Sequence, residues 1–268
     1  MSNPLGLDIG GANIKASDGL GCSVSREFAI WKQPDQLVPV LKEVLSTFPN
    51  APVIAATMTA ELADCFATKS EGVTTIVDAL VASASGRRIR FWQTVGEFVD
   101  PDDAKEFWSL TAASNWHALS TWAGRLAPSG CTVLIDVGST TCDIIPIEYG
   151  LPQPQGRTDG ERLRSGELLY TGVKRTPICA LSRKVMWNGE QVPLAAELFA
   201  TSRDVYLITG ELPERPDERD TADGRPATRD AAFQRLARML CCDQTEVTDA
   251  ELVAVARSLA ATQHSHVA

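Results

Sequence analysis

The sequence has few basic residues for its length and no segment suited to a membrane. Lys and Arg number 25 against 34 Asp and Glu, so the formal net charge is -9. Such a charge disfavours general affinity for nucleic acid or for an anionic membrane. No apolar run reaches the roughly 18 residues of a membrane span, and the N-terminal residues lack a secretory signal. We therefore expect a cytoplasmic protein without nucleic-acid or membrane partners, which holds any anionic ligand through local groups.

Several patterns of catalytic or metal-binding proteins are also missing. The seven cysteines include no Cys-x-x-Cys pair, so buried free thiols are expected rather than a metal cluster. Of the three histidines, only His117 lies outside the C-terminal tail. Because there is also no Gly-x-Ser-x-Gly segment, a Ser-His-Asp hydrolase is disfavoured. The Gly-x-x-x-x-Gly-Lys-Ser/Thr loop of the P-loop nucleotide-binding proteins is absent as well.

What is present is a mixture of strand and helix patterns. With 268 residues, 44% of them hydrophobic, the chain is long enough for one large domain or two small ones. The first half predicts a strand meander at 5–31, a helix at 35–48, a strand buried on both faces at 52–58, a helix at 72–85 and strand at 88–99. This alternation indicates an α/β protein.

The rest of the chain is richer in loops. Trp116, Leu119, Trp122 and Leu126 lie on one helical stripe, which favours core packing over a stacking platform for a ring. A polar connection is expected at 150–166, followed by a hairpin turn at Asn188-Gly189 and a charged loop at 213–230. Two helices follow; the second begins with Thr248 and Glu251 spaced as a capping box, and the tail at 262–268 is expected to fray.

One motif occurs twice. In "LDIGGANIK" and in "LIDVGSTTCDIIP", an apolar strand ends in an acid, Asp8 or Asp136, and a glycine turn follows. Backbone N–H groups at such turns can wrap phosphate oxygens, and each acid is placed to hold Mg²⁺ directly or through water. The phosphate-binding candidates in these turns are Gly10, Gly11, Asn13, Lys15, Gly138, Ser139, Thr140 and Thr141. One such turn alone would be taken for an ordinary tight hairpin, but the repetition favours phosphate binding.

The two motifs resemble the first and second phosphate motifs of the actin, hexokinase and Hsp70 superfamily. More closely, the chain resembles the hydantoinase/oxoprolinase-related proteins linked to tetrahydromethanopterin-dependent one-carbon transfer. The segments that carry this likeness, in order, are "TMTAELADCFATKSEGV", "AASNWHA", "RSGELLYTGVKRTP" and "TADGRPATRDAAFQRLARML". The resemblance implies two ribonuclease-H-like domains, at 1–127 and 128–268, around a central cleft.

It also implies an activity. The expected enzyme is a transferase of methanofuran-type cofactor biosynthesis, which joins an aminomethylfuran-methyl diphosphate to the phenol oxygen of a γ-glutamyltyramine-like acceptor and releases diphosphate. The lack of a clean apolar-Gly-Gly-apolar segment after residue 150, which would seat adenosine, suits a diphosphate leaving group. The expected cofactor is Mg²⁺, with ATP as the second candidate.

The expected reaction also needs a base for the phenolic proton and further cations for the anionic substrate. Glu61, just after a buried strand, and Asp143, within an apolar strand, are the candidate catalytic acids or bases. Lys174 and Arg175 are the candidate cations for an anionic substrate, with a solvated basic pair as the alternative. Arg225 in a Gly-Pro loop is a similar candidate.

Other interpretations stay open. Asn115 and His117 either approach the cleft or serve only helix packing. An ATP-dependent small-molecule kinase of the same superfamily is the second enzymatic interpretation, and an ATP-binding sensor without catalysis is a third. In each case the partner is a small phosphorylated molecule, and a homodimer is the expected oligomer.

Overall fold

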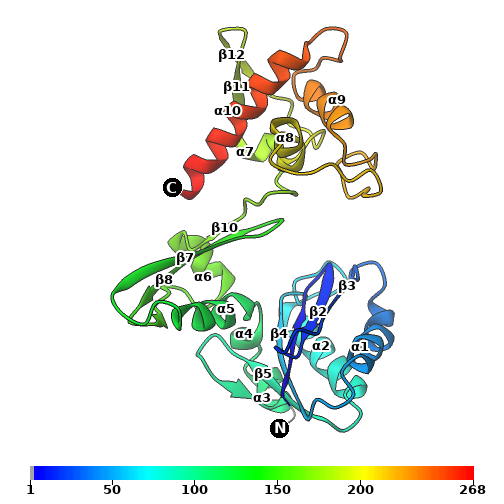
Figure 1. Ribbon diagram of the computed structural model, residues 1–268, viewed down its shortest axis with the longest axis vertical. Helices are drawn as coiled ribbons and strands as arrows, with labels where there is room; N and C mark the ends of the chain where they lie inside the picture. Colours follow the sequence, from blue (N-terminus) through cyan, green and yellow to red (C-terminus); the bar gives the residue numbers. More distant parts are fainter. Residues whose placement is uncertain (1–2) are drawn as a thin grey trace. The chain divides into compact units, whose positions relative to one another are not determined.

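The computed structural model describes residues 3–268, which form two compact units (Figure 1). One contains the described residues up to Leu134 together with Ile145–Glu167; the other contains Ile135–Ile144 and Leu168–Ala268. We call them unit 1 and unit 2. The domain boundary expected at 127/128 stays a prediction. The mixed α/β class is confirmed, because both units combine sheet and helix.

Unit 1 is built on a six-stranded sheet in the order β3-β2-β1-β4-β5-β6. Strands β1, β4 and β5 run parallel, and the remaining pairs are antiparallel. The meander and the later strands are therefore confirmed. Their bounds are β1 Leu5–Ile9, β2 Asn13–Ser17, β3 Ser23–Glu27, β4 Val53–Met58, β5 Arg88–Trp92 and β6 Phe98–Val99.

Only one face of this sheet carries the main core of unit 1. Alternate strand residues point to that face, where they pack with helices α1 (Leu37–Ser46) and α2 (Lys69–Ser83). Leu5, Leu7 and Ile9 of β1 are buried in this way. On β4 the other residues are only half-buried, so the expectation of a strand buried on both faces is wrong. On the opposite face of the sheet, small strand residues together with Trp92, Phe98 and Trp122 line a hollow.

The aromatic segment that follows β6 is not one helix. It forms α3 (Pro101–Glu106), α4 (Trp108–Thr111) and α5 (Asn115–Gly124), with a break where Ala113 takes a positive φ of 49°. Of the expected core stripe, only Trp116 is buried; Trp122 is 57% and Leu126 is 73% exposed. The prediction of core packing was wrong for the rest of the stripe, because helical spacing identifies a face without saying what covers it.

The polar connection after residue 150 also contains structure that was not expected. Strand β9 (Leu151–Pro152) pairs with the end of β8. Helix α6 (Asp159–Ser165) begins with a capping box between Thr158 and Glu161. Gly124 and Gly150 approach so closely that a Cβ on Gly124 would collide with the carbonyl of Gly150. This segment is therefore packed onto α5 rather than being an open linker.

Strands β7 (Cys131–Val137) and β8 (Cys142–Glu148) carry the chain between the units, and β8 pairs with β10 (Leu168–Leu169). The hairpin of β11 (Lys184–Trp187) and β12 (Glu190–Pro193) is confirmed; Asn188 and Gly189 both take positive φ, as a two-residue turn requires. The helices of unit 2 are α7 Ile178–Leu181, α8 Ser202–Thr209, α9 Arg229–Met239 and α10 Asp249–Val267.

At the two ends of helix α10, one expectation is confirmed and the other is wrong. The capping box of Thr248 and Glu251 is confirmed at its start. The helix continues to Val267, so the prediction of a frayed tail was wrong. Its inner face packs with α8 and α9 in the core of unit 2.

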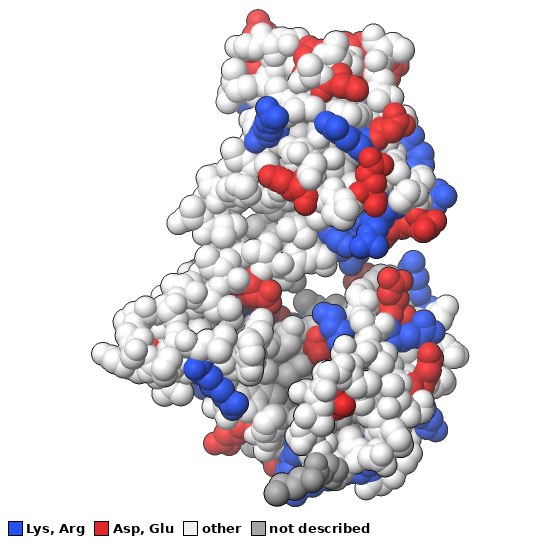
Figure 2. Space-filling view, viewed as in Figure 1, with Lys and Arg blue, Asp and Glu red and all other residues white. Residues whose placement is uncertain are grey.

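The surface agrees with the composition. Acidic and basic side chains lie beside one another over both units on the face shown in Figure 2. None of the helices within residues 3–268 combines the length and the apolar character needed to cross a bilayer. All seven cysteines are free, as expected, but Cys22, Cys131 and Cys241 are exposed, so the expectation of burial fails for these three.

Candidate functional site

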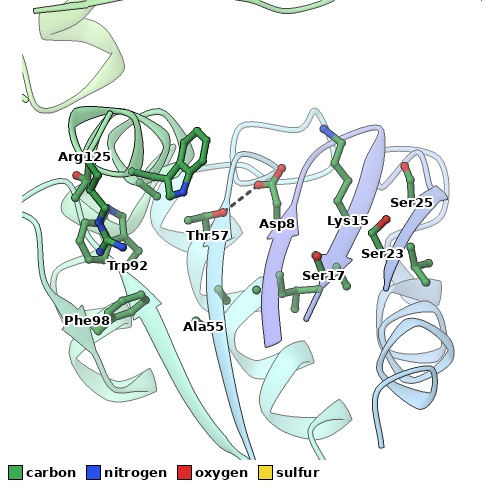
Figure 3. A pocket seen from close by; sticks show the side chains of 18 residues that line it. Asp8, Lys15, Ser17, Ser23, Ser25, Ala55, Thr57, Trp92, Phe98 and Arg125 are labelled. Carbon is green, nitrogen blue, oxygen red and sulfur yellow. Dashed lines mark hydrogen bonds between the residues drawn. The ribbon is translucent and has the colours of Figure 1, made fainter. Parts of the chain in front are cut away.

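The first glycine turn lies at the carboxyl end of β1. Asp8 is half-buried there, and its register partner on β2 is Lys15. The hydroxyl of Thr57 on β4 donates a hydrogen bond of 3.1 Å to Asp8 Oδ1 (Figure 3). Burial raises the pKa of Asp8, while the positive charge of Lys15 and the bond from Thr57 act in the opposite direction. A cation bound at this carboxylate would favour its charged form.

The turn itself is held tightly. The amide of Gly10 donates to the carbonyl of Asn13 at 3.0 Å, and a Cβ on Gly10 would lie 2.9 Å from that oxygen. Glycine is therefore required sterically at position 10. At Gly11 an added Cβ would meet nothing nearer than the Trp31 ring at 4.0 Å. The carbonyls of Gly11 and Ala12 accept the amides of Ile30 and Phe28, which fixes the outer side of the turn.

The second glycine turn, in unit 2, is joined to a distant loop through the backbone. Gly138 donates to the carbonyl of Thr141 at 2.8 Å, which closes the turn between β7 and β8. The carbonyl of Ser139 accepts the amides of Lys174 at 3.1 Å and Arg175 at 2.9 Å. The structure thus places the backbone of both basic residues against the second glycine turn.

A glycine makes this approach feasible. A Cβ on Gly172 would lie 2.5 Å from Thr140 N and 2.7 Å from the carbonyl of Gly138. These are backbone atoms, which cannot move aside as a flexible side chain would. Position 172 therefore holds a residue without a side chain so that the loop can lie against the turn.

Side chains from three directions fix the loop of Gly172. Its carbonyl accepts the Ser202 hydroxyl at 2.7 Å and the Gln263 amide at 2.9 Å. Its amide donates to Thr176 Oγ1 at 2.8 Å. Gln263 was not among the predicted site residues, because the tail at 262–268 was expected to fray; its amide is buried against the loop.

The candidate cations Lys174 and Arg225 differ in their surroundings. Lys174 Nζ lies 3.7 Å from a carboxylate oxygen of Glu218, which also pairs with the buried Arg203 at 2.6 Å. Arg225 pairs with Asp223 at 2.6 Å and bonds Gln234 within the same region. Arg225 is thus engaged in holding its own loop, which weakens its candidacy as a substrate contact.

The two candidate metal ligands lie in different units, Asp8 in unit 1 and Asp136, exposed on β7, in unit 2. Within residues 3–268 no three or more His, Cys, Asp or Glu side chains gather into a metal site. Mg²⁺ usually keeps several waters and binds one or two carboxylates together with substrate phosphates. A single carboxylate beside a glycine turn fits that mode of binding.

Glu61 is the most unusual carboxylate of unit 1. It is 1% exposed, and its Oε2 has no hydrogen-bond partner among residues 3–268. Its pKa is raised to about 7, chiefly by burial, with Lys69 acting against the rise and Asp159 adding to it. Gly72 lets α2 pack directly on the Glu61 backbone. A carboxyl with such a pKa can take up or release a proton near neutral pH.

The other candidates are placed more simply. Asp143 is half-buried on β8, opposite Leu168 of β10. The side chain of Asn115 accepts the amide of Trp116 at the start of α5. His117 is buried and accepts a hydrogen bond from Trp92. These contacts favour the packing interpretation of Asn115 and His117.

This chain is similar in sequence to known proteins. Residues 53–268 match the family described as Hydantoinase/oxoprolinase. The chain is 36% identical over 258 residues to the (4-{4-[2-(gamma-L-glutamylamino)ethyl]phenoxymethyl}furan-2-yl)methanamine synthase of Methanocaldococcus jannaschii, covering 95% of this chain and 76% of that protein. The synthase of the same name from Methanococcus vannielii is 38% identical over 124 residues, covering 46% of this chain and 55% of the relative.

A solved structure is similar more distantly. The nucleotide-free structure of acetone carboxylase, an enzyme of ATP-dependent acetone carboxylation, aligns with a TM-score of 0.42 and 11% identity, covering 90% of this chain and 41% of that chain. Such a likeness is too weak to carry a functional conclusion. The match over residues 53–268 and the 36% identity with the Methanocaldococcus jannaschii synthase establish that the chain belongs to the hydantoinase/oxoprolinase family.

Proposed function

We propose that this protein is a transferase of methanofuran-type cofactor biosynthesis. The phenol oxygen of a γ-glutamyltyramine-like acceptor attacks the methylene carbon of an aminomethylfuran-methyl diphosphate. The new carbon–oxygen bond is an aryl ether, the bond to diphosphate breaks, and the phenolic proton passes to a carboxylate of the protein. The observation that carries the proposal is the 36% identity over 95% of this chain with a synthase whose name describes such a phenoxymethylfuran.

The expected architecture forms part of the proposal. Two ribonuclease-H-like domains, at 1–127 and 128–268, would each contribute one phosphate turn. Support comes from unit 1, where an antiparallel three-stranded meander continues into parallel strands β4 and β5. In unit 2 the second turn follows the same strand–acid–glycine order. The site would lie in the cytoplasm, with no nucleic acid or membrane as partner.

The turns would hold the diphosphate. Backbone amides near Gly10, Gly11 and Gly138 and the hydroxyls of Ser139, Thr140 and Thr141 are suitable donors. Asn13, Lys15, Lys174 and Arg175 would add side-chain donors and positive charge. Asp8 and Asp136 would hold Mg²⁺, which when bound neutralises charge developing on the leaving diphosphate. Support for the grouping in unit 2 is the backbone contact of the Lys174 loop with Ser139.

Glu61 is the favoured proton acceptor, and Asp143 is the second candidate. The pKa of Glu61, about 7 through burial, matches a group that cycles between its charged and neutral forms near neutral pH. The deprotonated form receives the phenolic proton and releases it to solvent afterwards. Glu61→Gln keeps the shape of the side chain but removes this proton acceptor. Loss of activity in this variant would assign the role to Glu61, and full activity would leave Asp143 as the candidate.

The test is a product assay by mass spectrometry with the furfuryl diphosphate, γ-glutamyltyramine and Mg²⁺. Formation of the ether with release of one diphosphate, without any ATP, is the expected result. Lys174→Met should raise the KM for the diphosphate at least tenfold, whereas Lys184→Met on the exposed hairpin should leave it unchanged. Product that forms only with ATP, or phosphate appearing on a metabolite, would instead support the kinase interpretation and overturn the proposal.

A further inference from the structure

The sheet of unit 1 has a hollow on the face away from α1 and α2. Its volume is about 630 Å³, within the range of small-molecule sites. The outward residues of β1 to β4 form its floor, and apart from Asp8 and Lys15 those that line it are small or short: Gly6, Ser17, Ser23, Ser25, Ala55 and Thr57. A floor of larger side chains would fill this space. The hollow is therefore bounded by these small strand residues and by Ala118, Thr121 and Trp122 of α5.

Aromatic side chains line one side of the hollow. Trp92 of β5, Phe98 of β6 and Trp122 of α5 all contribute to it. Phe98 is 51% and Trp122 is 57% exposed, although burying such side chains is worth more than burying almost any other. Trp92 and Phe98 pack edge to face with ring centroids 4.8 Å apart, so each ring supports the other. Exposed aromatic surface gathered in a concave site is typical of ligand binding.

The charged groups of the pocket are few and distinct. Arg125, just after α5, lies on the side of Trp92 and Phe98, as Figure 3 shows. Asp8 and Thr57 lie between this side and the opposite one, where Lys15 and Ser25 lie. A ligand that matches the pocket has an apolar ring for the aromatic side and an anionic group for Arg125. Asp8 connects the pocket to the first phosphate turn, since it belongs to both.

We propose that this pocket binds the aromatic acceptor of the transfer reaction, a phenol whose side chain carries a carboxylate. The ring packs against Trp92, Phe98 and Trp122, and the carboxylate pairs with Arg125. The identity of the acceptor rests on the proposed function. The pocket assignment rests on its shape, its aromatic side and its charge, and it gives unit 1 a second role beside phosphate binding.

Binding measured without the furfuryl diphosphate tests the pocket separately from the reaction. γ-Glutamyltyramine carries both the ring and the carboxylate, whereas N-acetyltyramine carries the ring and a neutral amide without a carboxylate. Calorimetric titration of the full chain should show that Trp122→Ala weakens both ligands about tenfold. Arg125→Gln should weaken γ-glutamyltyramine by about the same factor and leave N-acetyltyramine within twofold, because only the first ligand offers a carboxylate.

Matched controls keep the result specific. Trp108→Ala removes a half-exposed tryptophan of the same unit outside the pocket, and Arg164→Gln removes an exposed arginine of α6. Neither should change either affinity. Ser25→Trp, which fills the hollow from β3 without removing any aromatic group, should weaken both ligands. Unchanged affinities in Trp122→Ala and Ser25→Trp would overturn the proposal.

Three further outcomes distinguish failure of the pocket assignment from failure of the proposed reaction. If the ligands bind as described but no ether forms with the furfuryl diphosphate, the pocket stands and the proposed reaction fails. If the ether forms and the acceptor KM is the same in all variants, the reaction stands and the pocket assignment fails. A wild-type dimer that becomes monomeric in Trp122→Ala, with no acceptor binding in either, would assign the hollow to a second copy of the chain and overturn the proposal.

Discussion

The indole N–H of Trp92 donates a hydrogen bond of 3.2 Å to Nδ1 of His117. This bond joins β5 to α5 behind the aromatic side of the pocket. Burial, followed by the positive charges of Arg157 and Arg162, lowers the pKa of His117 to about 4. The ring is therefore neutral over the physiological range. The acceptor role of Nδ1 assigns the remaining proton to Nε2.

Acid should therefore weaken the packing of α5 on β5. A folded-state pKa of about 4, below the ordinary 6.5, means that the unfolded chain binds the proton first as the pH falls. The contribution of His117 is complete above about pH 6.5 and declines toward pH 4, by about 1.4 kcal/mol for each pH unit between the two pKa values. Urea unfolding at several pH values measures it. His117→Gln should flatten this dependence, while His266→Gln on the exposed end of α10 should not; equal slopes in all three proteins would contradict the assignment.

Glu61 should change stability in the opposite direction over a similar pH range. Its folded pKa of about 7 lies above the ordinary 4.5, so the native state holds a proton that the unfolded state has lost. Stability should fall as the pH rises from about 4.5 to about 7 and then level off, the free energy of unfolding dropping by about 1.4 kcal/mol for each pH unit in this range. Glu61→Gln removes this loss, so the variant should gain stability over the wild type at pH 8 compared with pH 4.5. A constant difference between the two proteins at all pH values would contradict a raised pKa.

The same variant should lose activity if Glu61 is the proton acceptor. The kcat should fall by about 100-fold or more, since general base catalysis contributes on that order. The wild-type kcat/KM should rise with pH through about 7, where Glu61 becomes charged. Asp143→Asn provides the comparison. A large loss in Asp143→Asn with a normal pH profile in Glu61→Gln would transfer the role to Asp143.

Gly172→Ala should damage the second phosphate turn. The added methyl group would lie 2.5 Å from backbone atoms of Ser139 and Thr140, so the loop must move away and take Lys174 and Arg175 with it. We expect diphosphate affinity, measured by calorimetry, to fall at least tenfold. Gly160→Ala is the matched control, because its Cβ meets nothing within 4 Å and lies in a helix, where alanine is favoured. Equal affinities in the two variants would remove the loop from the phosphate site.

The contrast between these two glycines shows what the sequence could and could not predict. Local rules predicted the meander, the Asn188-Gly189 hairpin and the cap of α10, because neighbouring residues determine them. The clash at Gly172 depends on a turn far away in the sequence, and the positive φ of Ala113 has no local signature. The exposure of Trp122 could not be inferred either, since helical spacing is the same for a covered and an open stripe.

The buried pair of Arg235 and Asp204 should be the most sensitive ionic contact of unit 2. Arg235 Nη2 lies 2.7 Å from Asp204 Oδ1, and both side chains are almost fully buried. Asp204 Oδ2 also accepts the amide of Thr201 at the start of α8, so the pair joins α9 to the cap of α8. Burial raises the pKa of Asp204, and Arg235 is the main group that opposes the rise.

Arg235→Met should therefore destabilise unit 2 by about 3–5 kcal/mol at pH 7, because it leaves a buried carboxylate without its counter-charge. The loss should be smaller at pH 5, where Asp204, without the guanidinium, can take up a proton. Hydrogen exchange of the amides in α8 and α9 measures the effect locally. Arg238→Met removes an exposed partner of Asp223 and should cost under about 1 kcal/mol. If the two variants cost the same, the buried pair contributes no more than a surface contact.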